Sequence, residues 1–373
     1  MRILNIVESL DKGAVENWLV NVFIESRKTR PQWEWTFYCI LGKEGRLDEK
    51  VKEAGGKIIY SPSTVSAKWK FLQSLRKTVK DGSYDIIHSH HDFLSGFYLP
   101  AIVGFSFKKR ILHIHNTDEA VPVGNRKLEK FLRKPLKWLA IHFSDVIVGI
   151  SKDTLQQFTE NKFFNNKKTA LLYYGIDMIS FSKEVDRSSL RNEFDLPAES
   201  KLLLFSGRMN IFKNPLFVLD ILKELLQKDK NYYALFVGQG DLTKEVELKA
   251  AEYGISEHIR LPGWRNDLPS VMKSCDVFVF PRVEKPKEGL GLVVVEAQAA
   301  GLPMVLSYGV VPDAIELNAL ATFMPLKDNA ADWASKIALI KKEITPQDAL
   351  QKMMQSKFAL PLAAANLINL YET

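Results

Sequence analysis

The segment that decides the fold is Lys201-Leu-Leu-Leu-Phe-Ser206, followed by Gly207-Arg-Met-Asn-Ile-Phe-Lys-Asn214 and by Pro215. The first six residues form a nearly continuous apolar run, which is typical of a parallel strand covered on both faces. A loop containing glycine follows, and Pro215 suits the first turn of a helix that the pattern continues to Lys228. A strand, a loop and a helix in this order predict one unit of a parallel α/β fold.

The same alternation of strand and helix runs along both halves of the chain. We expect the other strands at residues 2–7, 35–41, 57–60, 86–88, 110–115, 146–150, 233–237, 259–261, 277–281 and 304–307. Helical patterns lie between them, for example at 15–26, 68–80, 242–253, 268–274 and 292–300. Both halves are therefore predicted to form Rossmann-like domains with parallel sheets.

The length of 373 residues exceeds one typical hydrophobic core and indicates two domains. We expect the first over residues 1–176 and the second over residues 177–354. Glycine and a change of pattern make Tyr173-Tyr-Gly-Ile-Asp177 a suitable hinge. Residues 355–373 are expected to form a closing helix that returns to the first domain.

The composition is that of a soluble globular protein, with 46% hydrophobic and 25% charged residues. Cys39 and Cys275 lie far apart in apolar runs, which argues against a disulfide framework and fits a reducing cytoplasm. The amino-terminal run is too short and too polar for a signal peptide, and no run of about 18 apolar residues occurs. We expect a cytoplasmic protein, with the inner face of the cell membrane as a peripheral location.

The net charge of +7 is concentrated in residues 1–178, whereas the remainder is slightly acidic. A basic half suggests an anionic partner: lipid headgroups, a lipid-linked diphosphate or nucleic acid. Nucleic acid is the weakest of the three, because no recognised module and no interleaving of aromatic and basic residues supports it.

Two cations, Arg208 and Lys213, lie in the loop that follows the strand ending at Ser206. Ligands of doubly wound sheets bind at the carboxyl ends of strands, and both cations can reach one diphosphate there. Two solvated loop cations are the alternative. Gly207 and Gly238, each just after a strand, would let the backbone approach a nucleotide.

Two carboxylates bracket a second glycine loop in Glu288-Gly-Leu-Gly-Leu-Val-Val-Val-Glu296, which runs on to Pro303. A carboxylate at such a turn accepts hydrogen bonds from sugar hydroxyls, and backbone N–H groups at a helix start favour phosphate. The segment by itself is a weak signal. Together with Arg208 and Lys213 it predicts a site for both ends of a nucleotide sugar.

The first domain offers a glycine turn and two histidine groups. Gly13 and Ala14 would permit close approach of a ligand to a helix start, or simply form an ordinary turn. Two later strands end in histidine groups, His88-Ser-His90-His91-Asp92 and His113-Ile-His115-Asn116-Thr117. The position at the end of a strand directs His115, Asn116 and Thr117 toward a ligand. Zinc binding is the competing interpretation; the absence of nearby cysteines and of a helical histidine pair argues against it.

Residues 126–139 combine an apolar helical stripe with many cations, and Pro135 is expected to interrupt or kink the helix. Such a segment suits the surface of an anionic membrane, or else a helix that packs on the core with a solvated basic face. The candidate membrane contacts are Lys127, Lys130, Arg133, Lys134 and Lys137.

In this order along nearly the whole chain, these motifs resemble the retaining, GT-B-fold glycosyltransferases of family 4, in particular their EpsF-like exopolysaccharide and capsule subgroup. The resemblance implies two Rossmann-like domains that face each other across a cleft. It implies that Arg208 and Lys213 hold the diphosphate of the donor and that Glu296 accepts from the ribose hydroxyls. It further implies that the transferred sugar and phosphate meet Glu288 and the backbone of Gly289, Leu290, Gly291 and Leu292.

The resemblance also implies roles for residues of the first domain, although this sequence differs from the family's pattern at three positions. His115 is similar to the family's histidine beside the transferred sugar, with His90, Asn116 and Thr117 as candidates on the acceptor side. The family usually has glycine where Asn214 stands, often serine in place of Arg282, and commonly a second glycine in place of Lys12.

The expected activity is retaining transfer of a sugar from a nucleotide sugar, most simply UDP-linked, to a glycan or lipid-linked acceptor. No cofactor and no metal are expected, because no acidic metal-binding motif stands in a suitable setting. The alternatives are a non-catalytic nucleotide-sugar-binding subunit, a GT-B-fold epimerase and a glycan phosphorylase. A phosphorylase should carry a pyridoxal-phosphate lysine, for which we find no candidate.

Overall fold

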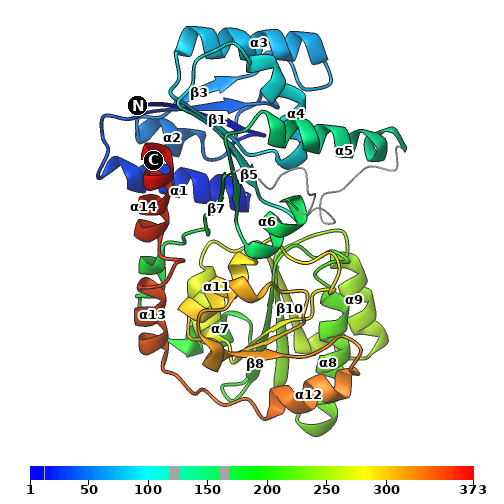
Figure 1. The fold of residues 1–373 in the computed structure, drawn as a ribbon. Coiled ribbons are helices and arrows are strands. Elements are labelled where there is room, and N and C mark those ends of the chain that lie inside the picture. The colour runs from blue at the N-terminus through cyan, green and yellow to red at the C-terminus, as the bar shows by residue number, and fades with distance from the viewer. Residues whose placement is uncertain (12, 118–126, 160–167) are drawn as a thin grey trace. The chain divides into compact units, whose positions relative to one another are not determined.

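The computed structural model describes residues 1–11, 13–117, 127–159 and 168–373, without the side chains of residues 127–130. The chain forms two compact units. Unit 1 comprises Met1–Ile176 and Lys357–Thr373, and unit 2 comprises Asp177–Ser356. Each unit contains one parallel β-sheet, and Figure 1 shows helices interleaved with the strands of both. The α/β fold class predicted from the sequence is confirmed.

Unit 1 is built, within the described residues, on a seven-stranded sheet in the order β3-β2-β1-β4-β5-β6-β7. Its central strands are buried along nearly their whole length, which explains their apolar runs. The strands are β1 (Arg2–Val7), β2 (Glu34–Cys39), β3 (Lys57–Tyr60), β4 (Ile86–Ser89), β5 (Lys109–Ile114), β6 (Val146–Gly149) and β7 (Lys168–Leu171). The helices are α1 (Ala14–Arg27), α2 (Asp48–Glu53), α3 (Lys68–Gly82), α4 (Ser95–Tyr98), α5 (Lys127–His142), α6 (Lys152–Thr159) and α14 (Leu360–Glu372).

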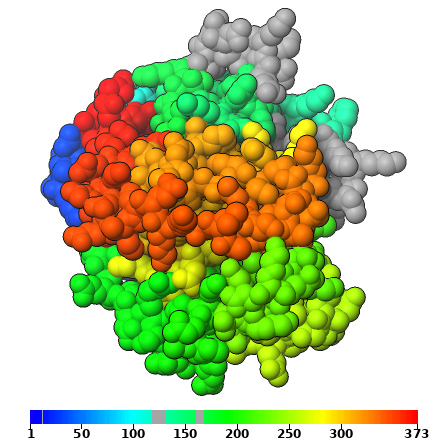
Figure 2. Space-filling model, turned by 90° about the horizontal axis from the view of Figure 1, so that it is seen from below, coloured from blue at the N-terminus to red at the C-terminus, as the bar shows by residue number. Residues whose placement is uncertain are grey.

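Unit 2 is built, within the part of the chain that the structure describes, on a six-stranded sheet in the order β10-β9-β8-β11-β12-β13. The strands are β8 (Lys201–Ser206), β9 (Tyr232–Val237), β10 (Ile259–Gly263), β11 (Val277–Phe280), β12 (Met304–Leu306) and β13 (Ala321–Phe323). The helices are α7 (Arg187–Glu193), α8 (Pro215–Lys228), α9 (Thr243–Glu252), α10 (Leu268–Ser274), α11 (Leu292–Ala299), α12 (Ala330–Ala338) and α13 (Pro346–Met354). Figure 2 shows the orange surface of α12 beside green α8, against which it packs.

The strand order of unit 2 reverses between β8 and β11, which are neighbours in the sheet. The chain winds outward in one direction through β9 and β10 and in the other through β12 and β13. In doubly wound sheets the loops at such a point diverge, and ligands bind outside the carboxyl ends of the two strands. The loops beginning at Gly207 and Pro281 occupy this position.

Two strands and part of the tail differ from the sequence expectations. The strands β7 and β13 are not predicted because both are short edge strands without a buried apolar run. The tail is not helical from residue 355, since α14 begins only at Leu360. Just before α14, the chain pairs with the end of residues 1–176, where the Ile176 N–H donates to the Phe358 carbonyl at 2.9 Å.

Candidate active site

The carboxyl ends of β8 and β11 bring together the cation loop and the first carboxylate of the glycine segment. The Lys213 ammonium lies 2.6 Å from Oε2 of Glu288. Arg282, just after β11, donates from Nε to the same oxygen at 2.5 Å. Sequence reasoning treats Arg282 only as a departure from the family, and its contact with Glu288 depends on the fold of the loop between them.

The two cations keep Glu288 ionised although it is mostly buried. Burial alone would raise the pKa of Glu288, but the attraction of Lys213 and Arg282 leaves that pKa below its ordinary value. Burial lowers the pKa of Lys213, and the contact with Glu288 opposes that shift. Lys213 also lies over the ring of Phe280, 4.8 Å from its centroid.

The cation loop is shaped by backbone conformations that few residues adopt. Asn214 has φ of 55° and ψ of 52°, the left-handed conformation that glycine adopts easily and asparagine tolerates. Its side chain donates to the Pro281 carbonyl at 3.1 Å. Asparagine therefore takes the place of the family's usual glycine in a conformation that suits both.

Gly207 and Gly238 lie in close contact after β8 and β9. A Cβ on Gly238, which has φ of 120°, would come within 2.2 Å of the Gly207 carbonyl oxygen. Arg208 follows with an exposed side chain that makes no hydrogen bond or ion pair to any described residue. This arrangement leaves one guanidinium available to an incoming anion at the carboxyl end of β8.

The second glycine segment ends at the start of α11. Gly291 precedes the helix with φ of 85°, and the side chain of Glu288 folds close to it. Gly289 is partly exposed, whereas Leu290 is buried. The first N–H groups of α11, from Leu292 onward, have no acceptor within the helix, which favours an anion at this point.

Glu296 lies on α11, eight residues after Glu288, which precedes the helix. Its side chain makes no hydrogen bond or ion pair with any described residue. Burial raises its pKa to about 7. The two glutamates therefore differ, because Glu288 forms ion pairs with two cations whereas Glu296 forms none with the described residues.

Unit 1 gathers four histidines at the carboxyl ends of β4 and β5. Neighbouring strands place His88 Nε2 3.1 Å from His113 Nδ1, and His90 Nδ1 3.0 Å from His115 Nε2. Burial, together with repulsion among the imidazoles, holds the pKa of His90, His113 and His115 well below the ordinary value. The cluster is therefore neutral at pH 7.

The hydrogen-bond partners determine the tautomer of His115. Asn5 Oδ1 accepts from His90 Nε2 at 3.2 Å, so His90 carries its proton there and accepts at Nδ1. His115 Nε2 is then the donor to His90, and His115 Nδ1 accepts from the Tyr174 hydroxyl. Both ring nitrogens of His115 are thus engaged within unit 1, which sequence reasoning did not foresee.

Asp92 connects the end of β4 to the end of β5. Its carboxylate accepts from the His115 N–H at 2.7 Å and from the side-chain amide of Asn116 at 2.9 Å. Asn116 is exposed, whereas Thr117 is fully buried. Of the three candidates on the acceptor side, Asn116 alone presents its side chain to solvent, since His90 is also buried.

Three of these histidines could hold a metal ion. One ring nitrogen each from His88, His90 and His113 lies within 4.8 Å of the others, and the described residues contain no other such group of histidine, cysteine or carboxylate side chains. The Tyr371 hydroxyl lies 2.7 Å from His88 Nδ1, so most of these nitrogens are already hydrogen-bonded. Strand pairing assembles this group, which spacing along the chain does not indicate.

The glycine turn of unit 1 carries a carboxylate. Gly13 precedes α1, whose first residue is Ala14, and the Glu16 carboxylate lies over Gly13 at the position that a Cβ would occupy. Burial raises the pKa of Glu16. An anion approaching Gly13 would meet this group, whereas a hydroxyl could donate to it. Lys12 lies outside the described residues.

From Lys127 on, the basic segment lies in one helix, α5, that continues through Pro135, so Pro135 does not interrupt it, while the kink stays a prediction. Arg133 lies over the ring of Phe93, and Lys137 donates to the Gln157 carbonyl at 3.0 Å. These two cations therefore contact unit 1. Lys134 is exposed, and the side chains of Lys127 and Lys130 lie outside the described residues.

The exposed face of α5 is aromatic as well as basic. Phe131 is 76% exposed and Trp138 47% exposed, with Lys134 and Pro135 between them. Leu136 rather than Phe131 packs against the buried cluster around Phe158. No helix among the described residues is long and apolar enough to cross a membrane.

Two family models match the chain. The model described as "Glycosyl transferases group 1" matches residues 186–355, and the model described as "Glycosyltransferase Family 4" matches residues 31–178. The first contains Arg208, Lys213, Glu288 and Glu296, and the second contains the four histidines.

Curated relatives match at low identity over much of their length. EpsF of Bacillus subtilis, which is named as a glycosyltransferase, is 24% identical over 340 residues, covering 90% of this chain and 87% of EpsF. The capsular polysaccharide biosynthesis glycosyltransferase CapH of Staphylococcus aureus is 26% identical over 80% of this chain and 78% of its own. An Escherichia coli enzyme named UDP-Gal:alpha-D-GlcNAc-diphosphoundecaprenol alpha-1,3-galactosyltransferase is 26% identical over 64% of this chain and 61% of its own.

Solved structures share the fold. HepE of Anabaena, determined in complex with UDP, superposes with a TM-score of 0.80 at 17% identity and covers 100% of both chains. WaaG, a glycosyltransferase involved in lipopolysaccharide biosynthesis, gives a TM-score of 0.73 at 14% identity over 99% of both chains. The two family models, which between them match residues 31–178 and 186–355, and the GT-B-fold structures show that this chain belongs to the GT-B-fold glycosyltransferases of family 4.

Proposed function

We propose that the chain is a retaining, metal-independent glycosyltransferase that moves a sugar from a UDP-sugar to a glycan or lipid-linked acceptor in surface polysaccharide synthesis. The observation that carries the proposal is the group at the carboxyl ends of β8 and β11, where Arg208 is exposed and Lys213 is paired with Glu288. The names of the curated relatives support the substrate class, since they include capsule synthesis and a UDP-galactose donor.

The residue types suit the chemistry of donor cleavage. Negative charge builds on the diphosphate as the sugar leaves, and Arg208, Lys213 and the N–H groups at the start of α11 would stabilise it electrostatically. Glu296, with no hydrogen-bond or ion-pair partner among the residues that the structure describes, would accept from the ribose hydroxyls. Glu288 would accept from hydroxyls of the transferred sugar. A displacement on the same face of the sugar needs no covalent nucleophile, so retention is compatible with these roles.

We assign acceptor binding to unit 1. The neutral histidine cluster holds His115 in one tautomer, and Asp92 holds the backbone of His115 and the side chain of Asn116. Because both His115 nitrogens are already bonded, a ligand would have to displace Tyr174 or His90 to reach them. Asn116 is the more accessible hydrogen-bonding group for a hydroxyl of the acceptor or the transferred sugar.

The test of donor binding is thermal stabilisation across a panel of nucleoside diphosphates and nucleotide sugars. A ligand at 100 times its Kd stabilises the folded state by about 2.7 kcal/mol. We expect UDP and one UDP-sugar to raise the Tm of the wild type. The same ligands should not raise the Tm of Arg208→Ala. Lys230→Ala, which removes an exposed cation before β9, serves as the control and should respond as the wild type does. Stabilisation by no nucleotide would refute the proposed function.

We also propose that α5 contacts an anionic membrane on the cytoplasmic side. Aromatic side chains favour the membrane interface, and cations favour anionic headgroups. We expect Phe131→Ser with Trp138→Ser to reduce co-sedimentation with phosphatidylglycerol vesicles, and Lys134→Glu to reduce it less. Trp264→Ser, which removes another exposed tryptophan, is the control. Unchanged co-sedimentation of the α5 variants would leave this face simply solvated.

A further inference from the structure

Arg282 and Lys213 share one oxygen of Glu288 but differ in how firmly they are held. Arg282 is 4% exposed and donates to the Val283 carbonyl at 2.8 Å and to the Pro286 carbonyl, besides Glu288. These contacts fix its guanidinium within the loop that leads to Glu288. Arg282 therefore contributes a permanent charge rather than a group free to follow a ligand.

Lys213 is held less firmly. Its ammonium makes one hydrogen bond, to Glu288, and its side chain is 18% exposed. An ammonium has three donors on a flexible stem, so it can turn toward a phosphate at small cost. Lys213 and Arg208 are also close enough for the charge of Arg208 to lower the pKa of Lys213, as expected for two groups that would share one diphosphate.

A contact between Lys213 and phosphate would weaken its contact with Glu288. A buried carboxylate without a cation either costs several kcal/mol or takes up a proton. Because Arg282 bonds the same oxygen, Glu288 keeps one cation at 2.5 Å after Lys213 turns away. The family often has serine at this position, so the arrangement belongs to this chain rather than to the shared motif.

We propose that Arg282 is a positioning residue that keeps Glu288 charged and in place while Lys213 moves its contact from Glu288 to the phosphate of the donor. The proposal rests on the function proposed above. It predicts that donor binding leaves the protonation of Glu288 unchanged only while Arg282 is present.

The experiment is calorimetric titration of UDP into the full-length wild type and Arg282→Met at pH 7.5–8.5, in two buffers with different ionisation enthalpies. We expect Arg282→Met to take up as many as one more proton per UDP bound than the wild type does. As pH rises, the affinity of Arg282→Met for UDP should therefore fall by as much as tenfold more per pH unit than that of the wild type. Uridine has a ribose for Glu296 but no phosphate for Lys213. The two proteins should therefore take up the same number of protons with uridine.

Arg191→Met is the matched control, because Arg191 is a buried arginine of the same unit that also bonds a carboxylate and carbonyls, at the other end of β11. The number of protons that Arg191→Met takes up per UDP bound should equal that of the wild type. If Arg282→Met does not fold, Arg282→Gln replaces it with the same expectation, since glutamine keeps donors without the charge. Equal proton counts in the wild type and the Arg282 variant would overturn the inference. Failure of the wild type to bind UDP would instead refute the proposed function.

Discussion

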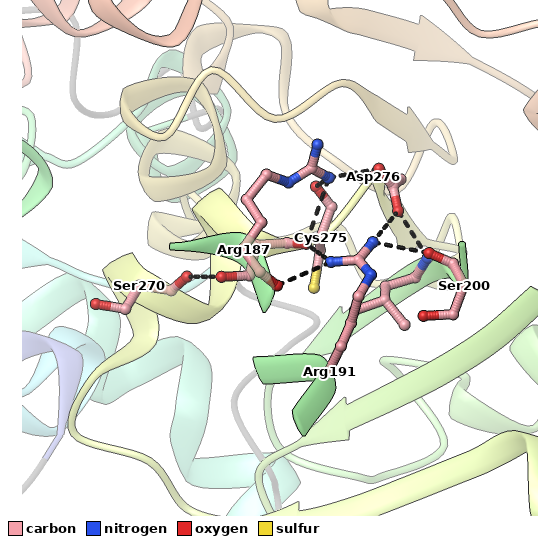
Figure 3. Close-up of polar contacts among 8 residues, drawn as sticks. Arg187, Arg191, Ser200, Ser270, Cys275 and Asp276 are labelled. Atoms are coloured by element: carbon pink, nitrogen blue, oxygen red, sulfur yellow. Dashed lines mark hydrogen bonds and ion pairs between the residues drawn. The ribbon is translucent and has the colours of Figure 1, made fainter. Parts of the chain in front are cut away.

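Strand β11 carries a carboxylate with two cations at each of its ends. At the amino end, Asp276 contacts Arg187 and Arg191, as Figure 3 shows. At the carboxyl end, Glu288 contacts Lys213 and Arg282. The two groups have the same charges and comparable distances.

The difference lies in how many donors remain for a ligand. At the amino end, Arg191 donates to the Ser200 carbonyl at 2.7 Å, and Asp276 accepts the Leu202 N–H at 2.9 Å, so the group ties α7 to the starts of β8 and β11. At the carboxyl end, Arg208 has no partner among the described residues and Lys213 has one. The same ion-pair chemistry thus joins elements at the amino end of β11, whereas at the carboxyl end it leaves donors without a partner among the described residues.

The largest expected effect separates the two ends by activity. Asp276→Asn and Glu288→Gln should each destabilise the protein by about 1–3 kcal/mol, because each leaves a buried arginine, Arg191 or Arg282, without its charged acceptor. Glu288→Gln should also lower transfer from the stabilising UDP-sugar by about 100–1,000-fold, the usual loss for a well-aimed group at a developing charge. Asp276→Asn should leave transfer nearly unchanged. Release of UDP and urea unfolding measure the two quantities.

Two outcomes would contradict this comparison of Asp276 with Glu288. Near-normal transfer by Glu288→Gln would show that Glu288 is not part of the active site. If Asp276→Asn lost as much transfer activity as Glu288→Gln at equal stability, the amino-terminal end of β11 would also contribute to function.

A smaller effect concerns Glu296, a carboxyl at the same end of the sheet without a cation. Its pKa is raised to about 7 in the folded state from 4.5, so the folded protein binds more protons than the unfolded chain between these values. Stability therefore falls as pH rises through that window, by about 3 kcal/mol, since each unit of pKa difference corresponds to about 1.4 kcal/mol. Glu296→Gln should lack this decline in a Tm series from pH 5 to pH 8.

The same group should make uridine binding depend on pH. A ribose hydroxyl donates better to a carboxylate than to a carboxyl, so the affinity of the wild type for uridine should increase several-fold from pH 6 to pH 8. Glu252→Gln, which neutralises an exposed carboxylate on α9, should behave as the wild type. A flat profile in the wild type would contradict the ribose role of Glu296.

The positions of Arg208 and Lys213 in the fold were predictable, because both residues lie in the loop that directly follows a strand. The bounds of β8 and α8 agree with the prediction, and the loop between them carries Arg208 and Lys213. Apolar runs covered on both faces give a strong local signal. The edge strands β7 and β13 lack that signal and were missed.

The contacts among the four histidines, and those of the histidines with two tyrosines, were not predictable from the sequence. Tyr174 lies in the hinge segment and Tyr371 in the last helix, and their hydroxyls reach His115 and His88 only through folding. That α5 directs Leu136 rather than Phe131 toward the core was not predictable either, because helical spacing gives a stripe but not the surface against which the helix packs.

The sequence by itself determined the alternation of strands and helices, the strand ends that carry chemistry and the family resemblance. These features depend on local periodicity and on residue types at short spacing. Only the tertiary structure decided which charges meet, because Lys213 lies in the loop after β8 whereas Arg282 and Glu288 lie in the loop after β11, and the order β8-β11 brings these two loops together. The free energy of a buried charge depends on its neighbours in space, so the distinction between the paired Glu288 and the unpaired Glu296 arises only in the folded chain.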